Sequence, residues 1–378
     1  MTVKELIARS KAAQAEFAFA TQEQADAAAK AICKVVYDNA EKLGPMAAEE
    51  SRMGSEQDKI AKCRNKSALI WESLKGKKSC DIINRIEERR MIEVAKPVGV
   101  VASIIPSTNP VVTPMSNGAF ALKCRNSVIF APHPRAVKCT KLLVEMFRAE
   151  LKKLGLPEDL VLGLEEVSND LTSELMSAAD MVVATGGMGM VKAAYSSGKP
   201  AIGVGQGNVQ CIIDEDADIA DAVGKIIIGR AFDNGLICLG EQTVFVPEDK
   251  EAEFVAEMKK QGGYLVEGEE NVDKLREGLF PGGGAFSRVV VGMFADQVSD
   301  EIGLGAPKGT RVLFAKAKAL GAGDVLCREK LCPVIAYMTY KTFKEGVAMM
   351  EANLDHEGKG HSIAVHSNTP ENVEYAAI

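Results

Sequence analysis

Strand-like apolar runs that alternate with helix-like segments constrain the fold of this chain most. Between Pro97 and Gly205 such runs recur, and amphipathic segments separate them. Alternation at a spacing of roughly 20–30 residues is typical of a parallel sheet with helices on both faces. We therefore predict a doubly wound α/β sheet whose strand carboxyl ends meet at one ligand-binding edge. The predicted strands are 98–106, 127–132, 160–166, 181–185 and 200–205.

The segments on either side extend this prediction to two domains. Residues 1 to about 92 are predicted to be helical, with Thr21 and Gln24 forming a capping box. From Gln206 a second α/β unit is predicted, with strands 209–215 and 242–248 and helices 218–232 and 250–261. The expected architecture is three-layer α/β/α, with one domain over 1–205 and a second over 206–378.

The charge and residue composition argue against nucleic-acid, membrane and metal partners. The net charge is −7, so the chain has no basic field for a nucleic acid. No apolar run approaches the roughly 20 residues that cross a bilayer, and the charged N-terminus lacks a signal-peptide core. The nine cysteines and four histidines form no pattern with metal-ligand spacing. We expect a cytoplasmic protein with no nucleic-acid, membrane or metal partner.

Cys238 lies in the segment FDNGLICLGEQ (232–242), three residues after the turn signal Asp233-Asn234-Gly235. A cysteine on a loop after a helix can be exposed and reactive. A buried structural cysteine is the alternative. Arg230 is close in sequence, but its direction on the preceding helix stays open.

Polar or glycine-rich turns follow three of the predicted strands. Asn109 follows the first strand and could donate to an oxyanion or be an ordinary turn residue. His133 follows the second, and could contact a cofactor ribose or cap the next helix. The cluster at Gly186 and Gly187 follows the fourth; its backbone N–H groups could meet an anion or simply form a tight turn. Glu329, before an apolar run, could be a solvated charge.

Taken together and in order, these segments resemble the aldehyde dehydrogenase superfamily, and specifically its CoA-acylating branch. The resemblance covers the whole chain and is closest to the CoA-dependent succinate-semialdehyde dehydrogenases. The segments that carry it are TNP (108–110), APHPRA (131–136), ATGGMGMVKAAYSSGKPAIGVGQGN (184–208), FDNGLICLGEQ (232–242), EKLCPV (329–334) and GKGHS (358–362), with PVVTPMSNG (110–118) and KVVYDNAEKL (34–43) favouring the succinate-semialdehyde group.

The resemblance implies a role for each candidate residue. Cys238 matches the nucleophile and Asn109 the oxyanion-hole asparagine. Five further residues match the cofactor site, which would take NAD or NADP: His133, Pro134, Glu329 and the two glycines of the diphosphate turn. That turn is Gly186 and Gly187, Glu329 matches the residue that holds the nicotinamide ribose, and CoA is the implied co-substrate.

One departure from hydrolytic relatives is informative. They carry a glutamate base where this chain has Gly203. Without that base, water is poorly activated toward a thioester, whereas a partly ionised thiol is already a good nucleophile. The resemblance therefore favours transfer to CoA over hydrolysis.

A second departure concerns the end of the sequence. Family members continue beyond AVHSNTPENVEYAAI, so the chain resembles a C-terminally truncated member. The segment near 84–97 resembles part of the family's oligomerisation hairpin, which implies a homodimer or homotetramer if the chain is complete.

Several alternatives remain open from the sequence alone. Acetaldehyde or butyraldehyde could replace succinate semialdehyde as the substrate. The chain could instead be a glutamyl-phosphate-type reductase that releases phosphate, or a non-catalytic truncated subunit.

Overall fold

The computed structural model describes all residues from Met1 to Ile378, and their contacts divide the chain into two compact units. Unit 1 comprises Met1–Arg52 and Glu56–Gly205. Unit 2 comprises Met53–Ser55 and Gln206–Ile378.

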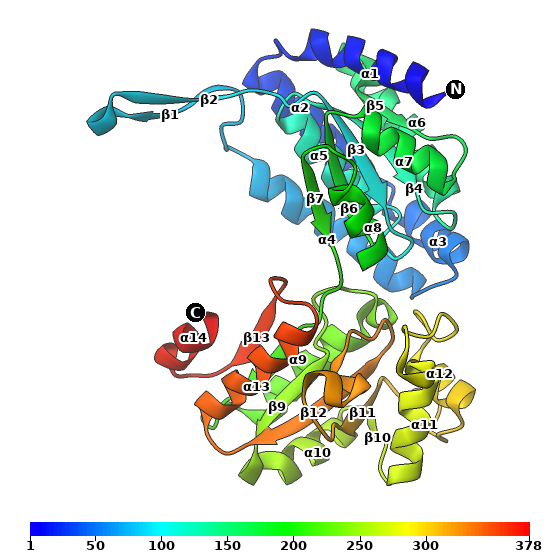
Figure 1. The fold of residues 1–378 in the computed structure, drawn as a ribbon, viewed down its shortest axis with the longest axis vertical. Helices are drawn as coiled ribbons and strands as arrows, with labels where there is room; N and C mark the ends of the chain where they lie inside the picture. The colour runs from blue at the N-terminus through cyan, green and yellow to red at the C-terminus, as the bar shows by residue number, and fades with distance from the viewer. The chain divides into compact units, whose positions relative to one another are not determined.

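A five-stranded parallel sheet forms the centre of unit 1 (Figure 1). Its spatial order is β5-β4-β3-β6-β7, so β3 is central and pairs with β4 on one side and with β6 on the other. The direction of winding therefore changes between β3 and β6, which is the switch point of a doubly wound sheet. The strands are β3 (Val100–Ile105), β4 (Ser127–Pro132), β5 (Val161–Gly163), β6 (Met181–Thr185) and β7 (Ala201–Val204).

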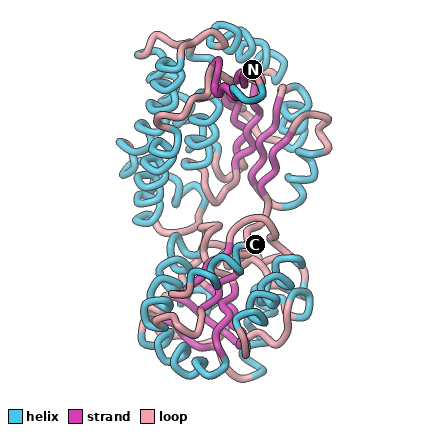
Figure 2. The backbone as a smooth tube through the Cα atoms, turned by 90° about the vertical axis from the view of Figure 1, so that its left-hand side faces the viewer, coloured by secondary structure: helices cyan, strands magenta, loops and turns pink.

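Helices cover both faces of this sheet, because the central strands are apolar on both sides (Figure 2). Val101 and Phe130 point into one core and Ala102 and Ile129 into the other. Burial of a side chain such as Phe130 stabilises the fold by roughly 1.5–3 kcal/mol. The helices are α1 (Val3–Phe17), α2 (Gln22–Asp38), α3 (Ala40–Ser51), α4 (Glu56–Leu74), α5 (Val112–Lys123), α6 (Val137–Lys153), α7 (Asn169–Ala178) and α8 (Met188–Tyr195).

The prediction of helix to about residue 92 is wrong beyond Leu74. The chain leaves the helix near Gly76, at φ 74°, and residues 81–95 form an antiparallel hairpin of β1 (Asp81–Ile86) and β2 (Met91–Ala95). Isoleucine and valine favour strands, and Arg90 adopts the left-handed conformation that the turn requires. The hairpin extends away from the other elements of its unit as an arm, with five exposed apolar side chains (Figure 1). These are Ile82, Ile83, Met91, Ile92 and Val94.

Unit 2 is built on a six-stranded parallel sheet in the order β10-β11-β12-β9-β8-β13. The predicted strands at 209–215 and 242–248 are its inner strands β8 (Gln210–Ile213) and β9 (Thr243–Pro247). The sequence analysis did not assign β10 (Gly263–Leu265), β11 (Val312–Lys316), β12 (Val334–Tyr340) or β13 (Ile363–His366). Its helices are α9 (Ile219–Ala231), α10 (Glu251–Lys260), α11 (Glu269–Leu279), α12 (Ala295–Ile302), α13 (Phe343–His356) and α14 (Pro370–Ala377).

These sheets confirm the predicted α/β class of fold. None of the helices is long and apolar enough to span a membrane.

Candidate functional site

Cys238 lies on the connection between α9 and β9 in unit 2, just after a tight left-handed turn. Asp233, Asn234 and Gly235 all have positive φ, at 50°, 52° and 75°. A side chain at Gly235 would come within 2.6 Å of the Cys332 backbone, so only glycine fits there. The Asn234 amide donates to Gly292 O at 2.9 Å and anchors the turn. Beyond this buried turn the chain reaches the surface, and Cys238 is exposed.

The buried cysteines are poor nucleophiles. Desolvation raises the pKa of Cys33 and of Cys332 to about 12, so both stay neutral thiols. Cys124 is also exposed, but partial burial raises its pKa as well. Among the nine cysteines, Cys238 therefore combines exposure with a position on a structured loop.

Gly207 joins three candidate groups of unit 2. Its N–H donates to Glu329 Oε1 at 3.2 Å. A Cβ on this glycine would lie 2.9 Å from the Cys238 carbonyl oxygen and 3.1 Å from His361 Nε2. Glu329, the Cys238 loop and the His361 imidazole therefore surround one glycine that leaves no room for a side chain.

Glu329 is a carboxyl group poised to change charge near neutral pH. Burial raises its pKa to about 7, and nearby Glu357 adds to that effect, although the Gly207 hydrogen bond opposes it. The Glu329 backbone N–H donates to Glu357 Oε1 at 2.8 Å. Glu357 in turn pairs with Arg328 at 3.3 Å, which fixes the loop.

Arg230 does not face a ligand. It is completely buried, and its guanidinium donates to the carbonyl oxygens of Lys330, Cys332 and Gly240. Desolvation lowers its pKa. The direction that the sequence left open is thus inward, where Arg230 ties two loops together.

In unit 1 the other candidates lie at the carboxyl edge of the sheet. Asn109 follows the central strand β3 and is half-buried. Its Oδ1 accepts a hydrogen bond from Lys62 Nζ at 3.0 Å, and its Nδ2 donates to Thr108 Oγ1 at 3.3 Å. Gly187 is the N-cap of α8, without a side-chain cap. Open space lies beside Gly187, which leaves the N-terminus of this helix available to an anion. The same turn begins with Gly186, whose N–H donates to Val204 O at 3.1 Å.

His133 and Pro134 follow β4 and are exposed. His133 Nδ1 accepts the backbone N–H of Arg135 at 3.1 Å, which is the local capping role that the sequence left as an alternative. The cofactor role of His133 stays a prediction.

Gly203, which the resemblance matches to the glutamate base of hydrolytic relatives, lies in β7. A Cβ there would lie 2.7 Å from Val191 Cγ1 and 2.9 Å from Tyr195 Cε2. Such distances require neighbouring atoms to shift, so the site does not admit a larger residue without rearrangement.

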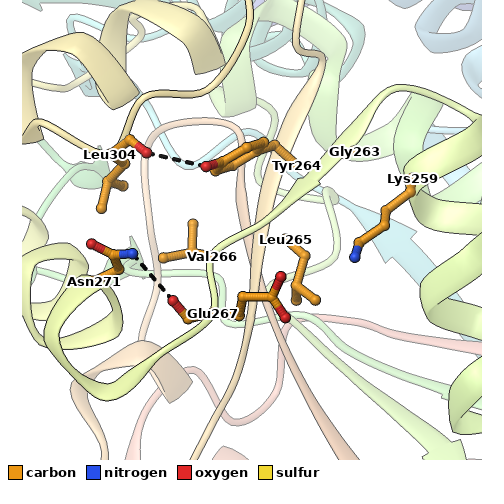
Figure 3. Close-up of a pocket in the computed structure, with 8 residues that line it drawn as sticks. All are labelled: Lys259, Gly263, Tyr264, Leu265, Val266, Glu267, Asn271 and Leu304. Atoms are coloured by element: carbon orange, nitrogen blue, oxygen red, sulfur yellow. Dashed lines mark hydrogen bonds between the residues drawn. The ribbon is translucent and has the colours of Figure 1, made fainter.

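A separate pocket of unit 2, with a volume of about 290 Å³, contains none of these residues (Figure 3). Its lining lies along β10 and just beyond that strand's carboxyl end. Tyr264, within the strand, donates to Leu304 O at 3.1 Å. Cys238 and Glu329 instead precede β9 and β12, at the amino ends of parallel strands. The pocket therefore lies near the carboxyl ends of the strands, and the candidate thiol lies near their amino ends.

Comparison with known proteins establishes the family. The family model described as "Aldehyde dehydrogenase family" matches residues 1–274. A succinate-semialdehyde dehydrogenase (acetylating) of Clostridium kluyveri is 47% identical over 376 residues, which cover 100% of this chain and 83% of that protein. The chain belongs to the aldehyde dehydrogenase family.

Other relatives place it in the acylating branch, as the sequence predicted. A sulfoacetaldehyde dehydrogenase (acylating) of Bilophila wadsworthia is 40% identical, over 99% of this chain and 82% of that protein. The acetylating aldehyde dehydrogenase structure from Geobacillus thermoglucosidasius has a TM-score of 0.94 at 35% identity, over 100% of this chain and 83% of that chain.

More distant structures include bound ligands. A Rhodopseudomonas palustris propionaldehyde dehydrogenase with bound CoA and an acylated cysteine has a TM-score of 0.87 at 27% identity. An engineered glycolyl-CoA reductase with bound NADP+ also has a TM-score of 0.87, at 26% identity. Each covers 100% of this chain and 85% of its own. The prediction that this aldehyde dehydrogenase uses a nicotinamide cofactor and CoA is confirmed at the level of the family.

The sequence analysis assigned no role to two residues that the structure places beside the candidates. His361 lies in GKGHS, a segment recognised only as part of the resemblance. Lys62 had no local signal, because its contact with Asn109 joins positions 47 residues apart.

Proposed function

We propose that this aldehyde dehydrogenase interconverts an aldehyde, CoA and NAD(P)+ with an acyl-CoA and NAD(P)H through a thioester on Cys238. The observation that carries this proposal is the arrangement around Gly207, where the exposed nucleophile loop lies beside Glu329 and His361. Gly203 supports transfer to CoA, because glycine carries no hydrolytic base and a larger residue there would displace the Val191 and Tyr195 side chains.

The residues present fit a nicotinamide dinucleotide. In unit 1 the uncapped α8 N-terminus at Gly187 lies at the carboxyl end of β6, where the diphosphate binds in doubly wound sheets. We assign Gly186 to the same turn, and His133 with Pro134 to the adenosine ribose. In unit 2 the half-buried Glu329 side chain is assigned to the nicotinamide ribose, whose hydroxyl groups can donate to its carboxylate.

In the proposed reaction the Cys238 thiolate attacks the aldehyde carbon and forms a C–S bond. Asn109 Nδ2 and the Cys238 backbone N–H donate to the oxyanion that develops. The oxidised nicotinamide, when bound, supplies the acceptor for the aldehyde hydrogen and two electrons. The carbonyl then re-forms and leaves an acyl thioester on Cys238 Sγ.

His361 is suited to the second half of the reaction. Partial burial lowers its pKa, so the imidazole is neutral at pH 7 and can accept a proton from the CoA thiol. The CoA sulfur attacks the thioester carbon, the bond to Cys238 Sγ breaks, and the thiolate is regenerated. His361 afterwards releases the proton to solvent.

Succinate semialdehyde, with succinyl-CoA as the acyl product, is the proposed substrate pair. The C. kluyveri relative is named for that aldehyde, and the B. wadsworthia relative is named for sulfoacetaldehyde. Both aldehydes carry an anionic group at the far end. Acetaldehyde and butyraldehyde, which are neutral, are the competing substrates.

We also propose a cytoplasmic homo-oligomer. The β1–β2 arm exposes a row of apolar side chains, and an isolated two-stranded hairpin is marginally stable in water. A second copy of the chain would bury that row. None of the nine cysteines forms a disulfide, which suits a reducing compartment.

The test follows reduced-nicotinamide absorbance with NAD+ or NADP+, with and without CoA, over a panel of the three aldehydes. We expect CoA-dependent turnover that is fastest with succinate semialdehyde. Cys238→Ala should abolish it, and Cys124→Ala, at the other exposed cysteine, should not. Turnover that requires phosphate in place of CoA would support a phosphate-releasing reductase. Near-normal turnover by Cys238→Ala would refute the thioester scheme.

A further inference from the structure

We propose that Lys62 is a positioning residue, whose ammonium group fixes the Asn109 side-chain amide in the orientation that donates to the substrate oxyanion. The inference rests on the proposed function, because that function assigns the oxyanion contact to Asn109. It adds a residue on α4, which is remote in sequence from every other candidate.

The contact joins a buried cation to the carboxyl edge of the unit 1 sheet. Lys62 Nζ donates to Asn109 Oδ1 at 3.0 Å, and the lysine is 5% exposed. Burial of an ammonium is costly unless its donors are satisfied, so the contacts that Lys62 makes hold it in place. The Asn109 carbonyl oxygen is one of these contacts.

This contact determines which way the amide faces. An ammonium has donors only, whereas the asparagine side chain has an acceptor oxygen on one side and an NH₂ group on the other. Rotation of the Asn109 amide by half a turn would set two donors against each other. Oδ1 therefore faces Lys62, and Nδ2 must point away from it.

The orientation leaves a donor for the substrate. Nδ2 carries two hydrogens, and its protein contact is the hydrogen bond to Thr108 Oγ1 at 3.3 Å. The second N–H is available for an oxyanion. The lysine charge on Oδ1 also polarises the amide, and hydrogen bonds in such a chain strengthen one another. Lys62 thus acts on the reaction through Asn109, without touching the substrate.

The experiment is a double-variant cycle in the full-length protein, with Lys62→Met, Asn109→Ala and the combination of the two. The readouts are kcat and KM for CoA-dependent aldehyde oxidation. Loss of an oriented oxyanion donor costs about 10²-fold or more, so a disordered one should lower kcat by about 10- to 100-fold. The KM for the cofactor should stay within about twofold. Lys62→Arg, which keeps a charged donor, should retain more activity than Lys62→Met.

The coupling between the two positions separates positioning from a general structural effect. In the Asn109→Ala background, Lys62→Met should cost less than about threefold, because the amide that Lys62 orients is gone. Lys123 is the matched control. It is the last residue of α5 in unit 1, it is 2% exposed, and its ammonium group pairs with Asp26 of α2. Lys123→Met should lower thermal stability and leave the kcat per folded molecule unchanged.

Two results would overturn the proposal: a kcat for Lys62→Met within about twofold of the unaltered enzyme, or an equal loss in both backgrounds. If Lys62→Met does not fold, Lys62→Gln gives the same test with a neutral donor and a smaller expected loss. Failure of the proposed function looks different, since turnover would then persist in Cys238→Ala.

Discussion

Replacement of Gly207 by alanine tests the arrangement at the centre of the proposed site. The new Cβ would lie 2.9 Å from the Cys238 carbonyl oxygen and 3.1 Å from His361 Nε2, whereas ordinary contacts begin at 3.4 Å. The Cys238 loop must therefore retreat by about 0.5 Å from its present position. A shift of the backbone at position 207 would also displace the N–H group that donates to Glu329 Oε1.

The expected cost follows from this displacement. A misplacement of about 1 Å at a catalytic group can cost roughly 10²-fold, so a shift of half that size should lower kcat by about tenfold. The assay compares kcat for CoA-dependent aldehyde oxidation with the midpoint of thermal unfolding. Because few atoms must move, we expect the folded state to persist.

Gly224→Ala is the matched control in the same unit. It lies in α9, and its new Cβ would meet only the flexible end of Gln261, at 3.1 Å. That variant should keep full activity. A Gly207→Ala enzyme with normal kcat and normal cofactor affinity would refute the claim that the three groups converge on this glycine.

Three further predictions concern single groups. Because burial raises the pKa of Glu329 to about 7, its carboxylate forms as the pH rises through that value. Cofactor affinity should therefore increase over the same pH range. In binding titrations, Glu329→Gln should remove this pH dependence of the affinity. Gly203→Glu should gain no CoA-independent hydrolysis and should lose about 1–3 kcal/mol of stability, measured by chemical unfolding, because the new side chain must displace Val191 and Tyr195. The Asp324 carboxylate, which Arg276 contacts at 2.7 Å and 2.9 Å, has a lowered pKa. Its contribution to stability is therefore present at pH values above 3.8, the ordinary pKa, and is lost as the pH falls through the lowered pKa of the folded state. Asp324→Asn should cost about 3 kcal/mol at neutral pH and remove this acid dependence of the unfolding free energy.

The sheet of unit 1 could be predicted from the sequence because its signal is local. The run SVIFAP coincides with β4 residue for residue, and the β3 run is buried along its whole length. Periodicity failed at the β1–β2 arm, where charged residues among the isoleucines look like the polar face of a helix. It also failed for short strands such as β10, whose three residues are too few to show a pattern.

The candidate site could be predicted only as a set of separate residues. The resemblance supplied Cys238, Asn109 and Glu329, but no local pattern shows that Glu329 meets Gly207, 122 positions earlier. His361 approaches the same glycine from the far end of unit 2. Such contacts depend on strand order and loop packing, which a single sequence does not reveal.

The buried guanidinium of Arg230 has a consequence for how this enzyme can diversify. Its donors reach Gly240 O on the thiol loop, and Lys330 O and Cys332 O on the loop that carries Glu329. One side chain therefore links the loop of the proposed nucleophile, Cys238, to the loop of the proposed ribose contact, so a shift of one loop is transmitted to the other. Substitutions elsewhere around the proposed site can therefore alter its lining while these hydrogen bonds keep the two loops together.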